Sequence, residues 1–166
     1  MGEKNYILQE IDIVYKPLKE MVTRPKIACP EDAIRLFREN WDDMKIGIQE
    51  QFKVMYLNRG NLVLGISNLS TGGLSGTVVD PKVLFAMALK VAASAVILAH
   101  NHPSGTLTPS DCDRKLTQKL EEVGKLLDIA VLDHVILSGL DNTAISMNSD
   151  STIVIDDSAI LKKLQP

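Results

Sequence analysis

Two histidines separated by one residue, His100 and His102, are the residues whose spacing points most clearly to chemistry. They follow a short apolar run typical of a strand, and alternate residues of a strand point to the same face. Two neutral imidazoles on one face form half of a tetrahedral zinc site. Asp113, in the first turn of a predicted helix, offers a third ligand. This set leaves the fourth position for a water, whose pKa zinc lowers to about 7.

Each part of this pattern also has a purely structural interpretation. A His-x-His pair alone is a weak indication of a metal, and Ser110 and Asp113 have the spacing of a capping box at a helix N-terminus. Gly105 and Pro109 are ordinary loop residues. The presence of all of them within residues 100–113 is what favours a metal site.

Helices and strands are predicted to alternate around this window. Helices are predicted from Pro30, from Pro81 and over residues 111–128, and strands over residues 51–57, 62–66, 94–99 and 129–137. A predicted hairpin turn at residues 58–61 makes the sheet mixed. Apolar stripes predict these buried helix positions: Ile34, Phe37 and Trp41; Leu84, Met87, Ala88 and Val91; Leu116, Leu120, Val123 and Leu127. The alternation predicts an α/β fold, with a mixed β-sheet flanked by helices on both faces.

The chain divides into a main domain and two flanking segments. Residues 1–26 are expected to form an N-terminal strand, near residues 7–15, and a linker. Residues 27–150 form the domain that carries the site, with a Gly- and Ser-rich loop at 68–76. Residues 151–166 form a C-terminal extension with a weak strand near 152–155 and a short helix after Asp157.

Composition limits the classes of function. The chain has 166 residues, a size that suits one domain, and a net charge of −3 that gives no reason to expect sequence-independent nucleic-acid binding. Its two cysteines do not resemble a disulfide framework. No apolar run resembles a signal peptide or is long enough to cross a bilayer. We therefore expect a cytoplasmic protein with reduced thiols and no membrane partner.

At this window the sequence resembles the JAMM signature of the MPN-plus metalloproteases. The signature consists of His100-x-His102-Pro103, a stretch that ends at Pro109, and Ser110-x-x-Asp113. The longer string HNHPSG, followed by PS and the aspartate, is similar to the RadC branch. So are Pro81 before a helix, Thr117, and a strand carrying Asp133-His134. The resemblance extends over residues 27–150 and implies a JAB/MPN, cytidine-deaminase-like three-layer fold.

The resemblance also implies roles for the matching residues. His100, His102 and Asp113 correspond to the ligands of one zinc ion per chain. Ser110 corresponds to the serine that stabilises the oxyanion, and Glu50 to the upstream acid that handles the proton of water. Without the resemblance, Glu50 would be interpreted as a solvated carboxylate at the edge of a strand.

These residues predict a zinc-dependent hydrolase, of the metallopeptidase or isopeptidase type, that acts on an unknown protein or peptide. Two alternatives stay open: a metal-dependent nuclease or DNA-repair factor, and a non-catalytic interaction module. RadC proteins commonly carry a helix-hairpin-helix module before this domain, and residues 1–26 show none, which weakens the DNA-repair alternative. His134 is interpreted as a buried, hydrogen-bonded structural histidine in preference to a residue supporting the zinc site.

Overall fold

The computed structural model describes residues 23–72 and 78–155 of the chain. Its elements are α1 (Pro30–Glu39), β1 (Gln51–Leu57), β2 (Val63–Thr71), α2 (Pro81–Lys90), β3 (Ala95–His102), α3 (Asp111–Leu126), β4 (Ala130–Ser138), β5 (Thr143–Ser146) and β6 (Ser151–Val154). The strand predicted near residues 7–15 and the helix predicted after Asp157 lie outside the described residues.

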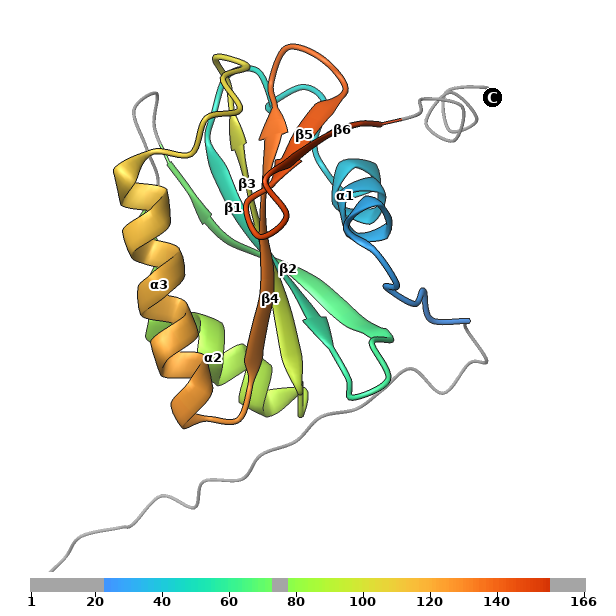
Figure 1. Ribbon diagram of the computed structural model, residues 1–166, viewed down its shortest axis with the longest axis vertical. Helices are drawn as coiled ribbons and strands as arrows, with labels where there is room; N and C mark the ends of the chain where they lie inside the picture. The colour runs from blue at the N-terminus through green and yellow to red at the C-terminus, as the bar shows by residue number, and fades with distance from the viewer. Residues whose placement is uncertain (1–22, 73–77, 156–166) are drawn as a thin grey trace, which may run out of the picture.

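The six strands form one mixed sheet in the order β2-β1-β3-β4-β5-β6 (Figure 1). β3 and β4 are parallel, and every other neighbouring pair is antiparallel. The parallel pair is joined through α3, as expected because parallel neighbours need a crossover connection. The predicted mixed sheet is therefore confirmed.

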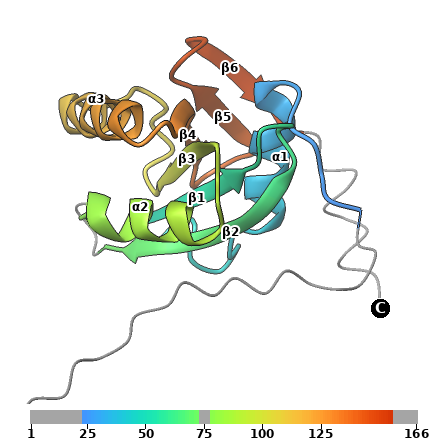
Figure 2. The ribbon, with the colours of Figure 1, turned by 90° about the horizontal axis from the view of Figure 1, so that it is seen from below.

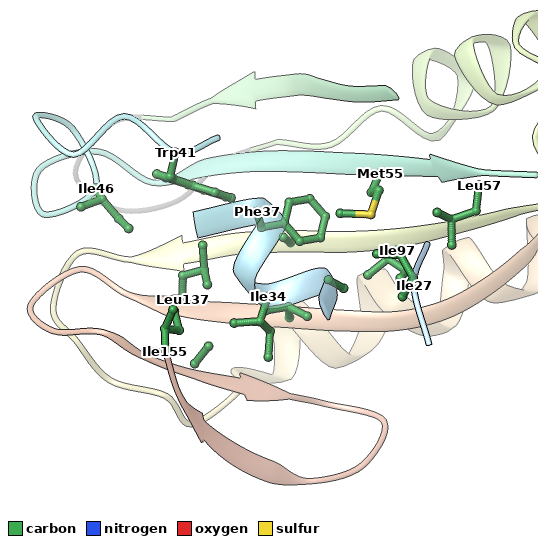
Figure 3. Close-up of a cluster of buried hydrophobic side chains, with 14 of the residues drawn as sticks. Ile27, Ile34, Phe37, Trp41, Ile46, Met55, Leu57, Ile97, Leu137 and Ile155 are labelled. Atoms are coloured by element: carbon green, nitrogen blue, oxygen red, sulfur yellow. The ribbon is translucent and has the colours of Figure 1, made fainter. Parts of the chain in front are cut away.

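Helices cover both faces of the sheet, which gives three layers. α2 and α3 lie on one face and α1 lies on the other (Figure 1, Figure 2). Both sides are packed with buried apolar side chains. The α1 side includes Ile34, Phe37, Met55, Ile97 and Leu137 (Figure 3), and the α2 and α3 side includes Phe52, Leu84, Val96, Leu98 and Leu120. The predicted α/β fold of the JAB/MPN kind is confirmed.

Residue types at the helix ends explain where the helices begin. Pro30 is the first residue of α1, where its fixed φ suits a helix and its missing N–H costs nothing. Asp80 caps α2 by accepting a hydrogen bond from the backbone N–H of Lys82. Trp41 is buried as predicted, but it lies beyond the end of α1 and packs edge-on against Phe37 at 6.5 Å between ring centroids.

Three strands differ from the prediction. β3 continues past residue 99 to His102. β2 continues to Thr71, so part of the predicted loop at 68–76 is paired with β1. A register irregularity between Phe52 and Lys53 interrupts the regular pairing there, which removes the two-residue periodicity that the prediction relied on. β5 was not predicted, because four residues that include Thr and Ser give little apolar signal even though most of them are buried.

Helix burial also departs from the prediction. Phe85 is buried in α2, whereas Met87, Val91, Leu116 and Val123 are only partly buried and pack against the core. Leu127 is exposed, because α3 ends at Leu126 and the backbone turns to a positive φ at Asp128. Within residues 23–72 and 78–155, no helix has the length and apolarity needed to cross a membrane.

Candidate metal centre

Strand β3 places His100 and His102 on the sheet face that α2 and α3 cover. Val96 and Leu98, which precede them with the same parity, belong to the apolar cluster on that face. The strand continues through His102, so the alternation of side chains carries both imidazoles to one side. His100 is 1% exposed, and 17% of the His102 side chain is exposed. The pair therefore spans the boundary between the core and the surface.

The N-terminus of α3 presents Asp113 to these histidines. Ser110 is the N-cap, and its hydroxyl accepts a hydrogen bond from the Asp113 backbone N–H at 3.2 Å. Asp113 Oδ2 in return accepts from the Ser110 backbone N–H and from its hydroxyl, both at 2.7 Å. The predicted capping box is thus present, and it fixes the direction of the Asp113 carboxylate.

The three side chains converge on one small space. His100 Nε2 lies 3.0 Å from His102 Nε2 and 3.3 Å from Asp113 Oδ1, and His102 Nε2 lies 3.7 Å from Asp113 Oδ2. Donor atoms about 2.0–2.2 Å from one tetrahedral ion are roughly 3.3–3.6 Å apart. The separations are close to these values, so His100, His102 and Asp113 fit a shared metal ion.

A hydrogen bond determines which nitrogen of His102 is available. His102 Nδ1 contacts the carbonyl oxygen of Thr106, and a carbonyl can only accept, so Nδ1 carries the proton. In the neutral ring Nε2 therefore has a free lone pair, and this lone pair faces His100 and Asp113. An Nδ1–H bond to a backbone carbonyl is a common way to orient a histidine that binds metal.

The electrostatics of the site favour positive charge. Burial raises the pKa of Asp113, but its hydrogen-bonding contacts with His100 and His102 outweigh burial and hold the pKa of this carboxyl well below its ordinary value. The hydrogen bond to Asp113 in turn raises the pKa of His102, against the effect of burial. The carboxylate is therefore ionised and stabilises a cation between the two rings, whether a proton or a metal ion.

The sheet register explains how Glu50 reaches this region. β1 and β3 are antiparallel with Phe52 opposite His100, so the same register extended by two residues puts Glu50 opposite His102. Glu50 is partly buried, and its charge contributes to raising the pKa of His102. Its assignment as the proton-handling acid stays a prediction, as does the assignment of Ser110 as the oxyanion donor.

A buried histidine behind the ligands was not assigned to the site from the sequence. His134 on β4 is 1% exposed and contacts His100 Nδ1 at 2.8 Å through Nε2. Its Nδ1 contacts Thr117 Oγ1 at 2.6 Å. An irregularity in the pairing of β3 with β4, just before Asp133, sets the face on which His134 lies. Periodicity alone therefore could not have placed it, although its position on an apolar strand correctly predicted burial.

Asn101, between the two histidines, was also missed. Its side chain points to the opposite face and is fully buried. Its Oδ1 accepts from the backbone N–H of Gln51 at 2.8 Å, and its Nδ2 donates to the carbonyls of Ile46 at 2.6 Å and Gln49 at 2.9 Å. Asn101 therefore fixes the segment that leads through Glu50 into β1.

Comparison with known proteins agrees with this geometry. Residues 27–152 match the model of the RadC-like JAB domain, and the chain belongs to this family. It is 40% identical over 134 residues to a UPF0758 protein of Alkaliphilus metalliredigens, covering 81% of this chain and 56% of that protein. It is 42% identical over 131 residues to a UPF0758 protein of Desulforamulus reducens, covering 79% and 56% respectively. The chain spans about half the length of the curated relatives it matches.

Proposed function

We propose that this chain is a zinc-dependent hydrolase of the JAMM type that cleaves peptide or isopeptide bonds in a protein or peptide substrate. The proposal is supported above all by the convergence of His100, His102 and Asp113, on a JAB fold, around a space that fits one ion. Two histidines and a carboxylate are a ligand set of catalytic zinc, which keeps one position for water or substrate.

The proposed metal would supply the electrophile, since bound zinc polarises a carbonyl oxygen and lowers the pKa of water to about 7. Asp113 is the anionic ligand, and its hydrogen bonds from Ser110 keep it oriented. His102 presents the Nε2 lone pair because its Nδ1 proton is bound to the Thr106 carbonyl. The ligands are therefore oriented by hydrogen bonds within the protein.

Glu50 and Ser110 are proposed to move and stabilise charge. The Glu50 carboxylate takes a proton from water as the new C–O bond forms, and returns it to the leaving nitrogen as the C–N bond breaks. The Ser110 hydroxyl lies beside Asp113 and donates to it in this structure. Turned toward the substrate, the same O–H would stabilise the oxyanion of the tetrahedral intermediate.

We also propose a cytoplasmic location for this activity. Cys29 and Cys112 are both exposed and free. Exposed free thiols suit a reducing compartment, where disulfides rarely form.

Two matched variants test the proposed function. Asp113→Asn removes the carboxylate ligand, whereas Asp111→Asn removes an exposed acid from the same helical turn. The substrates are a fluorogenic peptide mixture, peptides joined through a lysine isopeptide bond, and single- and double-stranded oligonucleotides. We expect amide cleavage that is lost with a chelator, restored by zinc, abolished in Asp113→Asn and retained in Asp111→Asn. Zinc-dependent cleavage of the oligonucleotides alone would instead support the nuclease alternative.

A further inference from the structure

A line of three hydrogen bonds connects one proposed ligand to the backbone of another. It runs from His100 Nδ1 to His134 Nε2 at 2.8 Å, from His134 Nδ1 to Thr117 Oγ1 at 2.6 Å, and from Thr117 Oγ1 to the Asp113 carbonyl at 2.7 Å. His134 and Thr117 do not belong to the group of ligand atoms that converge on the site. Both nonetheless affect which nitrogen of His100 is free to bind an ion.

The direction of the line can be read from its last bond. A carbonyl oxygen only accepts, so the single hydroxyl proton of Thr117 is donated to the Asp113 carbonyl. The Thr117 oxygen can then only accept from His134, which places a proton on His134 Nδ1.

Burial determines whether the other nitrogen of His134, Nε2, carries a proton. The ring is 1% exposed and packs edge-on against Phe52 at 5.4 Å between ring centroids. A charged imidazole in such a place is destabilised unless a carboxylate contacts it. The ring nitrogens of His134 instead contact His100 and Thr117. The neutral ring with its proton on Nδ1 has a lone pair on Nε2, so His100 Nδ1 must be the donor to it.

We infer that Thr117 and His134 are positioning residues that hold His100 in the Nδ1–H tautomer, with the Nε2 lone pair directed at the metal. This inference rests on the proposed zinc site. The two ligand histidines are thereby oriented differently. A backbone carbonyl sets the tautomer of His102, whereas His100 meets another histidine, which has two tautomers of its own.

The Thr117 hydroxyl therefore determines which of two tautomers His134, and through it His100, adopts. Without it, His134 can carry its proton on Nε2 and donate to His100 Nδ1. His100 would then carry its own proton on Nε2, where it blocks the metal. Thr117 thus controls zinc affinity from a position behind the ligand, without contacting the ion.

The experiment compares Thr117→Val, which keeps the shape and removes the hydroxyl, with Thr117→Ser, which keeps the hydroxyl. Thr143→Val, which removes a hydroxyl bonded to Asp141, is the matched control outside the site. Zinc affinity is measured by competition with a chelator. We expect Thr117→Val to bind zinc about 10–100-fold more weakly, the range typical for loss of a group that supports a ligand. Thr117→Ser and Thr143→Val should stay close to the wild type.

A second measurement needs no zinc. Long-range ¹H–¹⁵N NMR spectra of the zinc-free protein at pH 8, above the ordinary histidine pKa of about 6.5, report the tautomer of each ring. The wild type should show His100 and His134 both protonated on Nδ1, and Thr117→Val should lose this pattern. A wild-type His100 protonated on Nε2, or unchanged zinc affinity in Thr117→Val, would overturn the inference. A wild type with the expected tautomers that binds no zinc would instead contradict the proposed function.

Discussion

The two faces of β3 end in polar side chains that are used differently. On the face that α2 and α3 cover, the open side, His100 and His102 direct ring nitrogens toward a shared space that fits an ion. On the face toward α1, the satisfied side, Asn101 is hydrogen-bonded within the protein. On the first face, Val96 and Leu98 are followed by His100 and His102, whose Nε2 atoms converge with Asp113. On the second, Ala99 is followed by Asn101, whose side chain is fully buried with three backbone partners.

This difference shows how one strand can both build a site and support it. On the α1 side, the side chain of Asn101 is hydrogen-bonded to the backbone of the protein, so it adds rigidity. The polar groups on the other side are oriented from behind, by Thr106 and by His134. Their front atoms are left to an ion, which is what a preorganised metal site requires. Four substitutions test this contrast.

The largest effect is expected at the open side, for Glu50→Gln. The amide keeps the shape of the side chain but cannot take a proton, and loss of a general base typically lowers the rate by ~10²–10⁴-fold. Zinc content, measured by mass spectrometry of the metal, should be unchanged because Glu50 is not a proposed ligand. Glu121→Gln, an exposed acid of α3, is the control. Full activity in Glu50→Gln would return Glu50 to the role of a solvated strand-edge carboxylate.

Ser110→Gly separates the cap from the proposed oxyanion donor. Glycine is a tolerated N-cap, so replacing serine with it should cost only a few tenths of a kcal/mol in unfolding free energy. Loss of an oxyanion donor should lower the rate by roughly 10²–10³-fold. Thermal unfolding and zinc content are measured beside the rate. If stability, zinc and activity all remained near normal, Ser110 would be a helix cap and nothing more.

On the satisfied side, Asn101→Ala should act on stability. The variant leaves the Gln51 N–H and the carbonyls of Ile46 and Gln49 without their partner, and we expect a loss of roughly 2–4 kcal/mol in unfolding free energy. Asn148→Ala, which removes one exposed hydrogen bond, should cost less than about 1 kcal/mol. Equal, small losses in chemical denaturation would show that the Asn101 network is not a support.

The smallest effect is expected for Asp80→Ala, which removes the N-cap of α2. The loss of one cap should cost about 1 kcal/mol of stability. Zinc content and activity should not change. The Asp80 carboxylate caps α2 through the Lys82 N–H, whereas the Ser110 cap is bonded to the proposed ligand Asp113. A large loss of zinc in Asp80→Ala would mean that α2 is coupled to the site more tightly than its contacts indicate.

The sequence could predict the open side better than the satisfied one. His100, His102 and Asp113 occur within a short window and have ligand chemistry, so spacing and residue type were enough to bring them together. Glu50 needed the family resemblance, because only the pairing of β1 with β3 brings it opposite His102. His134 and Asn101 depend on strand register and on which face a side chain occupies. A pairing irregularity or a change of register alters both without leaving a sign in the sequence.

The same limit explains which parts of the fold were predicted. The apolar stripes of α1 and α3 and the buried run of β3 identified the layers, because burial on a helix or central strand has a strong periodic signature. β5 and the end of β2 are held mainly by pairing with neighbouring strands, so their own residues carried little signal.

The central claim is that His100, His102 and Asp113 hold one zinc ion. X-ray absorption of chelator-stripped protein reloaded with one equivalent of zinc tests it most directly. We predict one tightly bound zinc per chain, surrounded by nitrogen and oxygen at about 2.0–2.2 Å. In Asp113→Asn the same treatment should leave little zinc bound, and in Asp111→Asn it should leave a full equivalent. Failure of the wild type to retain zinc, or a sulfur shell at about 2.3 Å from the exposed Cys29 or Cys112, would contradict the account.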